Sequence, residues 1–135
     1  MISLSDYLGK WQYTPVATPL VVENAGNLLP KVNALLARFE AEGGALCVNP
    51  HTGTLVSGAG LGGIRPPDCE EGAANSSHKV GRGVDVYDPH GALDKWLTDE
   101  LLAIYGLYRE HPEKTDGWVH LTDRPPPSKK RTFWP

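Results

Sequence analysis

Two histidines and one aspartate are spaced in a way that suits a metal site. The stretch from Ser76 to Asp85 places His78 seven positions before Asp85, and His120 follows 35 positions after the aspartate. Two imidazoles and one carboxylate leave one coordination position of a zinc ion open, which distinguishes a catalytic zinc from a structural one. The sequence therefore predicts one Zn²⁺ ion per chain, bound by His78, Asp85 and His120.

The elements around these residues can bring them to one point. Residues 84–87 predict a short strand that carries Asp85, with His78 in the loop before it. Glycines between the two ligands allow this loop to turn tightly. His120 alternates with apolar neighbours in the segment 118–121, so its side chain is expected on the opposite strand face from theirs.

Each predicted ligand also has a structural interpretation. A carboxylate in the apolar strand of Asp85 is costly to bury unless it is paired or bound to a metal. An ion pair with Arg65 or Arg82 is the alternative to metal binding. His78 lies among small polar residues, so a histidine of the apolar core is a poor interpretation of it. The three residues together favour a metal site.

The same residues resemble a known family. The run from Ser76 to Asp85 resembles the first metal motif of the zinc D-alanyl-D-alanine carboxypeptidases, a group that includes phage endolysin peptidases and murein endopeptidases and shares its fold with hedgehog domains. Five positions fill the motif, with glycine where alanine is usual: Ser76, His78, Gly81, Gly83 and Asp85. Residues 118–120 are similar to the second motif, and residues 57–67 to an expanded form of an upstream strand ending in Ser-Gly-x-Arg. The likeness covers roughly residues 45–135.

The resemblance implies a zinc peptidase that acts on peptidoglycan stem peptides or cross-links, as a D,D- or L,D-carboxypeptidase or as an endopeptidase. Arg65 would then hold the substrate carboxylate or the developing oxyanion, because a guanidinium presents paired donors to a planar anion. A surface arginine is the alternative. Ser76 would orient the metal loop or touch the substrate, and a hydrogen bond to local backbone is equally compatible.

The general base is where the chain departs from the family pattern. Relatives carry an acid three positions before the last ligand, or a histidine two positions before it, and this chain has Gly117 and Trp118 there. Asp116 is the nearest carboxylate and is predicted to be the base. Weaker candidates are Asp123, Glu110 and His111. The departure leaves open a second hypothesis, a non-catalytic zinc-binding or structural module of a phage particle or secretion apparatus.

The composition fits a small enzyme. The chain has 135 residues and a net charge of −3, with no basic patch for nucleic acid and no apolar run of membrane-spanning length. We expect a monomer whose partner is the peptide substrate. The N-terminus lacks a signal peptide, so synthesis in the cytoplasm is expected, with phage or prophage origin and access to the wall after release or on a virion. Cys47 and Cys69 are expected to be free thiols.

Hydrophobic periodicity predicts an α+β fold. The resemblance implies a small antiparallel sheet flanked by helices, with the zinc site on the sheet face, as in hedgehog domains and the zinc D-alanyl-D-alanine carboxypeptidases. Residues 24–42 predict a helix ended by Gly43-Gly44, with Asn27 as its cap and Pro30 in its first turn or at a kink. A second helix is predicted over 93–105, broken near Thr98 or Asp99.

The remaining segments complete a single domain over residues 1–135. Strands are predicted as a pair within 45–67 and at 84–87, 107–109 and 117–121. Residues 1–18 are expected to form an arm that packs its aromatic residues, among them Trp11 and Tyr13, onto the domain, and residues 125–135 to form a solvated tail.

Overall fold

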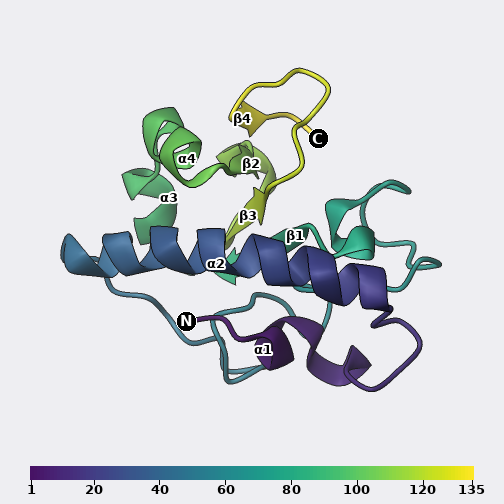
Figure 1. Ribbon diagram of the computed structural model, residues 1–135. Coiled ribbons are helices and arrows are strands. Elements are labelled where there is room, and N and C mark those ends of the chain that lie inside the picture. Colours follow the sequence, from purple (N-terminus) through teal and green to yellow (C-terminus); the bar gives the residue numbers. More distant parts are fainter.

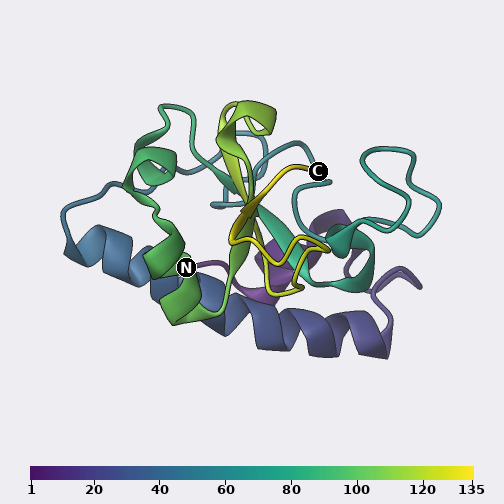
Figure 2. The same cartoon turned by 90° about the horizontal axis from the view of Figure 1, so that it is seen from above.

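The long helix α2 (Pro19–Ala41) runs the length of the molecule along one side of a four-stranded sheet (Figures 1 and 2). The computed structural model describes residues 1–135. The other helical elements are α1 (Leu4–Leu8), α3 (Ala92–Trp96), α4 (Asp99–Tyr105) and the 3-10 turns η1 (Gly9–Trp11), η2 (Ser77–Val80) and η3 (Pro112–Lys114). No helix combines the length and the apolar character needed to cross a membrane.

Helix α2 begins five residues earlier than predicted and is not capped by Asn27. Thr18 is its cap, and the Thr18 hydroxyl accepts a hydrogen bond from the Val21 N–H at 3.3 Å. Pro30 lies inside the helix, where its ring leaves the Gly26 carbonyl without an intrahelical donor. Both residues are exposed, so water can satisfy that carbonyl. The helix therefore passes through a proline that was expected near its start.

The sheet has the order β1-β3-β2-β4 and is mixed, whereas an antiparallel sheet was predicted. Its strands are β1 (Gly83–Tyr87), β2 (Tyr108–Glu110), β3 (Trp118–Thr122) and β4 (Thr132–Phe133). The first three are antiparallel neighbours, and β4 pairs parallel to β2. The chain therefore returns after β3 to the free edge of β2, so residues 125–135 are only partly the solvated tail that was predicted.

One face of the sheet packs against α2, and the other carries the candidate site. Val84 and Val86 on β1 and Val119 and Leu121 on β3 are buried in the same apolar core as eight residues of α2. Successive side chains of a strand point to opposite faces. Asp85 and His120, which alternate with these core residues, therefore project from the opposite face.

The segment 45–67 was predicted to contain two strands and contains none. It makes only isolated bridges, Asn49 with Thr54 and Val56 with Val86. Its backbone nevertheless follows β1, since the Ser57 N–H donates to the Asp85 carbonyl at 2.8 Å and the Asp85 N–H donates to the Gly62 carbonyl at 2.7 Å. Glycines at positive φ between these two contacts interrupt the extended conformation, which prevents a regular strand.

The N-terminal residues form a short helix within the segment that was predicted to be an arm. Ser3 and Asp6 form a capping box that starts α1, a helix the sequence did not predict. Trp11 packs as expected and donates to the Gly60 carbonyl at 3.2 Å, but the prediction was wrong for Tyr13, which is 95% exposed. The Tyr7 hydroxyl donates to the Gly83 carbonyl at 2.9 Å and so ties α1 to the start of β1.

The predicted helix break is confirmed. Helices α3 and α4 lie together beside the C-terminal half of α2 (Figure 1). The Thr98 hydroxyl accepts from the Leu101 N–H and caps α4, and Gly106 ends that helix in the left-handed conformation.

Candidate metal centre

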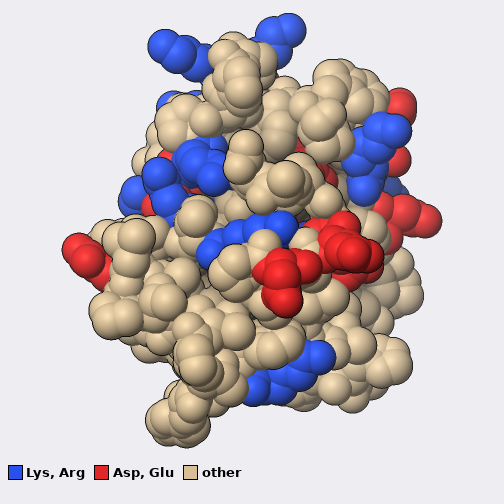
Figure 3. Space-filling view, turned by 90° about the vertical axis from the view of Figure 1, so that its right-hand side faces the viewer, with Lys and Arg blue, Asp and Glu red and all other residues tan.

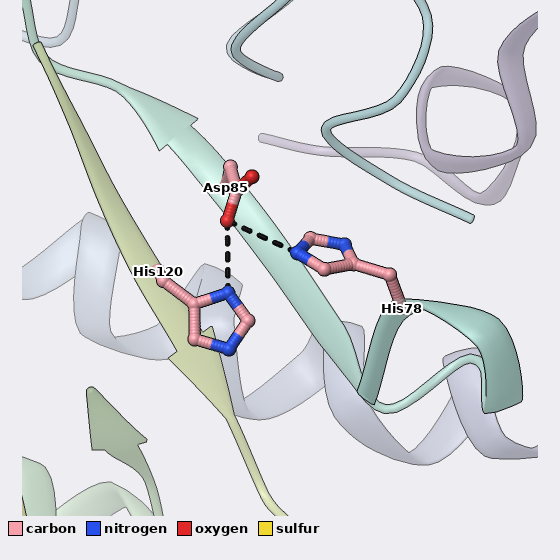
Figure 4. A group of neighbouring side chains, drawn as sticks. All are labelled: His78, Asp85 and His120. Carbon is pink, nitrogen blue, oxygen red and sulfur yellow. Dashed lines mark hydrogen bonds and ion pairs between the residues drawn. The ribbon is translucent and has the colours of Figure 1, made fainter. Parts of the chain in front are cut away.

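His78, Asp85 and His120 meet on the sheet face as predicted. Asp85 Oδ1 lies 2.8 Å from His120 Nδ1 and 3.2 Å from His78 Nε2, so both imidazoles face the same oxygen (Figure 4). The three ligand atoms lie within 4.8 Å of one another, and all three residues are buried. This group can hold a metal ion.

Strand register brings two of the three residues together. Asp85 on β1 and His120 on β3 are paired positions in the antiparallel ladder. Paired side chains on one face have Cβ atoms about 4.5–5.5 Å apart, which is within reach of one shared ion.

His78 is held by the short turn η2. The Ser76 hydroxyl accepts from the His78 N–H at 3.3 Å and caps this turn, and Gly81 ends it at a φ of 76°. The His78 ring is fixed by Nδ1, which lies 2.7 Å from the Gly63 carbonyl oxygen. A carbonyl can only accept, so Nδ1 carries the proton and Nε2 is directed at Asp85.

This tautomer calls for a cation at the centre. A neutral His78 presents a lone pair on Nε2 to an Asp85 oxygen 3.2 Å away, and two lone pairs repel. His120 Nδ1 approaches the same oxygen, while His120 Nε2 lies 3.3 Å from the Ser77 hydroxyl. Either protons on the rings or one shared metal ion compensates this arrangement. A bond from the second ring nitrogen to a carbonyl, as His78 makes to Gly63, is what metal-binding histidines usually have.

The charge of Asp85 is stabilised from several sides. Burial by itself raises the pKa of Asp85. When both imidazole rings are protonated, the charge of His78 and hydrogen bonds from both histidines outweigh burial and hold the pKa well below its usual range. Its second oxygen, Oδ2, lies 3.3 Å from an Arg65 guanidinium nitrogen. The carboxylate is therefore ionised, which is the form that binds metals.

The donor atoms would have to move slightly apart to coordinate a small tetrahedral ion. Donors around zinc stand about 3.4 Å apart, because Zn–N and Zn–O bonds are about 2.0–2.1 Å long. The distances of 2.8 and 3.2 Å from Asp85 to the histidines are a little shorter than that. A tetrahedral ion held by these three residues would have one position without a protein ligand, and all three residues line the adjoining cavity.

This cavity has a volume of about 640 Å³ and opens above the sheet. All four strands contribute side chains to its floor. Asp85 of β1 pairs with His120 of β3, and Glu110 of β2 pairs with Phe133 of β4. The walls are residues 71–77 of the metal loop and the C-terminal segments 124–128 and 133–135. The predicted tail is thus part of the cavity wall.

Arg65 lines the cavity beside the metal group and contacts Asp85. Its Nε donates to the Leu61 carbonyl at 2.7 Å and a terminal nitrogen donates to the Glu71 carbonyl at 3.4 Å, in addition to the Asp85 contact. This is the ion pair that the sequence offered as an alternative. Ser76 lines the cavity and makes the local backbone hydrogen bond that was also anticipated.

The predicted base, Asp116, lies outside the cavity. It is exposed in the turn before β3, whereas Glu110, a weaker candidate, lines the cavity on the strand next to His120. Asp123 is paired with Arg82 at 2.9 Å and does not line the cavity. His111 stacks on Trp134 with ring centroids 3.9 Å apart. Both cysteines are free, and neither belongs to the metal group.

Arg124 was not singled out from the sequence, although a signal for it exists. Every second residue from β3 onward lines the cavity: Trp118, His120, Thr122 and Arg124. Such alternation is the period of a strand. Extending it three residues past the predicted strand would have placed Arg124 on the face of His120.

Comparisons with family models, curated proteins and solved structures found no match for this chain. The function proposed below therefore rests on the chain's residues, their geometry and the motif resemblance of residues 76–85 and 118–120.

Proposed function

We infer that the protein is a zinc-dependent peptidase that cleaves an amide bond in peptidoglycan stem peptides or cross-links. The observation that carries this proposal is the His78, Asp85 and His120 group at the floor of an open cavity, with the carboxylate of Glu110 on the neighbouring strand. A structural zinc site is closed by four protein ligands, and here only three converge.

A zinc ion held there would supply Lewis acidity, which polarises a scissile carbonyl and lowers the pKa of water. The chain's own residues would do the rest. Arg65 and the Gly63 carbonyl keep Asp85 and His78 in place, so the ligands are positioned before substrate enters. The cavity walls would orient the peptide over the floor residues.

Glu110 is the proposed general base in place of Asp116. It lies on β2, the strand next to β3, and lines the same cavity as His120. From there it can take a proton from water and return it to the leaving amine. Asp116 is exposed and lines no part of the cavity.

The substrate class rests on the resemblance of residues 76–85 and 118–120 to the zinc D-alanyl-D-alanine carboxypeptidases. The charges of the cavity side are compatible with a small peptide. On the face seen in Figure 3, acidic side chains gather right of the centre beside a basic one, and further basic side chains lie above, to the left and below.

The test is digestion of purified peptidoglycan by the zinc-loaded protein, with the products identified by mass spectrometry. Released D-alanine indicates a carboxypeptidase, and split cross-links indicate an endopeptidase. Chelator should stop either reaction, and added zinc should restore it. Stoichiometric zinc binding without any new product would support the second candidate, a non-catalytic zinc module.

A further inference from the structure

We propose that Arg124 binds a carboxylate of the peptide substrate and so sets which peptides the cavity accepts. This rests on the proposed peptidase function and adds the chemical group that the substrate must carry. Of the charged residues lining the cavity, only Arg65 and Arg124 are cationic.

The two arginines differ in how many of their hydrogen-bond donors the protein already uses. All three nitrogens of the Arg65 side chain donate to protein oxygens, one of them to the Asp85 carboxylate. Arg124 makes a single side-chain hydrogen bond, to the Asn75 carbonyl, and no carboxylate lies within 4.0 Å of it. A guanidinium has five donors, so Arg124 keeps most of its donors for a ligand.

Arg124 is also positioned and not merely exposed. It is half-buried, its backbone N–H donates to the Thr122 hydroxyl at 3.0 Å, and its bond to Asn75 joins the C-terminal wall to the metal loop. The following residues 125–127 are prolines, which limit backbone motion beside it. A guanidinium held in this way loses little freedom on binding, which favours a paired contact with a carboxylate.

The distance along the strand indicates which carboxylate it can reach. Arg124 lies four residues beyond His120, at most about 13 Å along an extended strand. An extended peptide advances about 3.4 Å per residue, so the carboxylate lies within about four residues of the scissile bond. Stem peptides carry both a terminal carboxylate and side-chain carboxylates within that span, and the experiment separates them.

The experiment uses three peptides with one scissile bond: both carboxylates free, the terminal one amidated, and the side-chain one amidated. Each is measured with wild type, Arg124→Gln and Arg124→Lys for hydrolysis. Affinity is measured by calorimetry in the zinc-loaded Glu110→Gln background. We expect amidation of one carboxylate to lower wild-type kcat/KM or affinity at least tenfold. On the peptide with both carboxylates free, Arg124→Gln should lower kcat/KM or affinity by the same factor. On the peptide whose recognised carboxylate is amidated, Arg124→Gln should change these values almost not at all. Arg124→Lys should keep only part of the wild-type kcat/KM or affinity for the free peptide, because lysine keeps the charge but not the paired donors.

The matched control is Lys130→Gln, which removes one positive charge from an exposed position of the same segment that does not line the cavity. It should leave all values unchanged, and zinc content should be equal in all variants. Equal effects of Arg124→Gln on all three peptides, or no effect on any, would overturn the inference. If no peptide is hydrolysed, the peptidase proposal fails, while the binding measurements still decide the role of Arg124.

Discussion

The carboxylate of Asp85 and the imidazole of His120 occupy paired positions on adjacent antiparallel strands, with Oδ1 and Nδ1 2.8 Å apart. Two ligands from distant parts of the sequence are thus fixed by the backbone ladder, and not by flexible loops. Only His78 comes from a turn, and its ring is held by the Gly63 carbonyl. A site built in this way keeps its geometry before any ion binds.

Metal content tests the ligand assignment. The protein should bind about one zinc per chain, and His78→Ala and His120→Ala should each remove it, because two remaining ligands hold zinc weakly. Elemental analysis after dialysis measures this. His90→Ala is the matched control, since His90 is exposed and outside the metal group. Full zinc occupancy in the His78→Ala/His120→Ala double variant would contradict the assignment.

The identity of the base is tested by two isosteric changes. Glu110→Gln should lower turnover of peptidoglycan fragments on the order of a hundredfold or more while zinc stays bound, because proton transfer is lost and coordination is not. Asp116→Asn should leave turnover near wild type, because Asp116 lies outside the cavity. The reverse outcome would return the role to Asp116.

Gly83 is predicted to tolerate no side chain. A Cβ at this position would overlap the Ser77 hydroxyl and lie 3.0 Å from His120 Cε1. Gly83→Ala should therefore destabilise the protein by about 1–3 kcal/mol, as overpacking does, and weaken zinc binding. Urea unfolding measures the first effect and competition with a chelator the second.

The control for this change is Gly26→Ala on α2, where an added Cβ meets nothing within 4 Å. Alanine is a better helix former, so this variant should gain about 0.5–1 kcal/mol. Equal stability of the Gly83→Ala variant and wild type would show that the site relaxes more easily than its packing indicates.

Tyr7 should make stability sensitive to alkaline pH. Its burial raises the pKa of its hydroxyl, to which the nearby charge of Asp85 adds. The folded protein therefore keeps a proton that the unfolded chain releases near pH 10, so this contribution is complete below about pH 10 and is lost as pH rises above it.

Replacement by phenylalanine isolates this effect. Tyr7→Phe should cost about 1 kcal/mol at pH 7, because the buried Gly83 carbonyl loses its donor. Its stability should then fall less than that of wild type between pH 9 and 11, measured by urea unfolding. Tyr13→Phe, at an exposed position, is the control and should follow wild type. Parallel pH curves for Tyr7→Phe and wild type would contradict the assignment.

Local patterns predicted the elements whose signals are contained in a few residues. Alternation around Asp85 and His120 predicted the strands that carry them, and Thr98 marked the break between α3 and α4. The start of α2 was misplaced because Pro30 is a local signal for a helix start. Burial of apolar residues before and after it outweighs that signal.

The sequence by itself determined the types and the spacing of the three ligands, because these follow from residue chemistry. It also determined the strand faces that carry Asp85 and His120, because these follow from the period of two along a strand. Only the tertiary structure decided which groups share the cavity. Pairing of β2 with β3 puts Glu110 on the strand next to His120, in the same cavity, and leaves Asp116 outside. The return of the chain as β4 makes Phe133 part of the floor. Such pairings join segments far apart in the chain. Their register depends on which face of the whole sheet is buried, and a slip of one residue would turn every side chain to the other face.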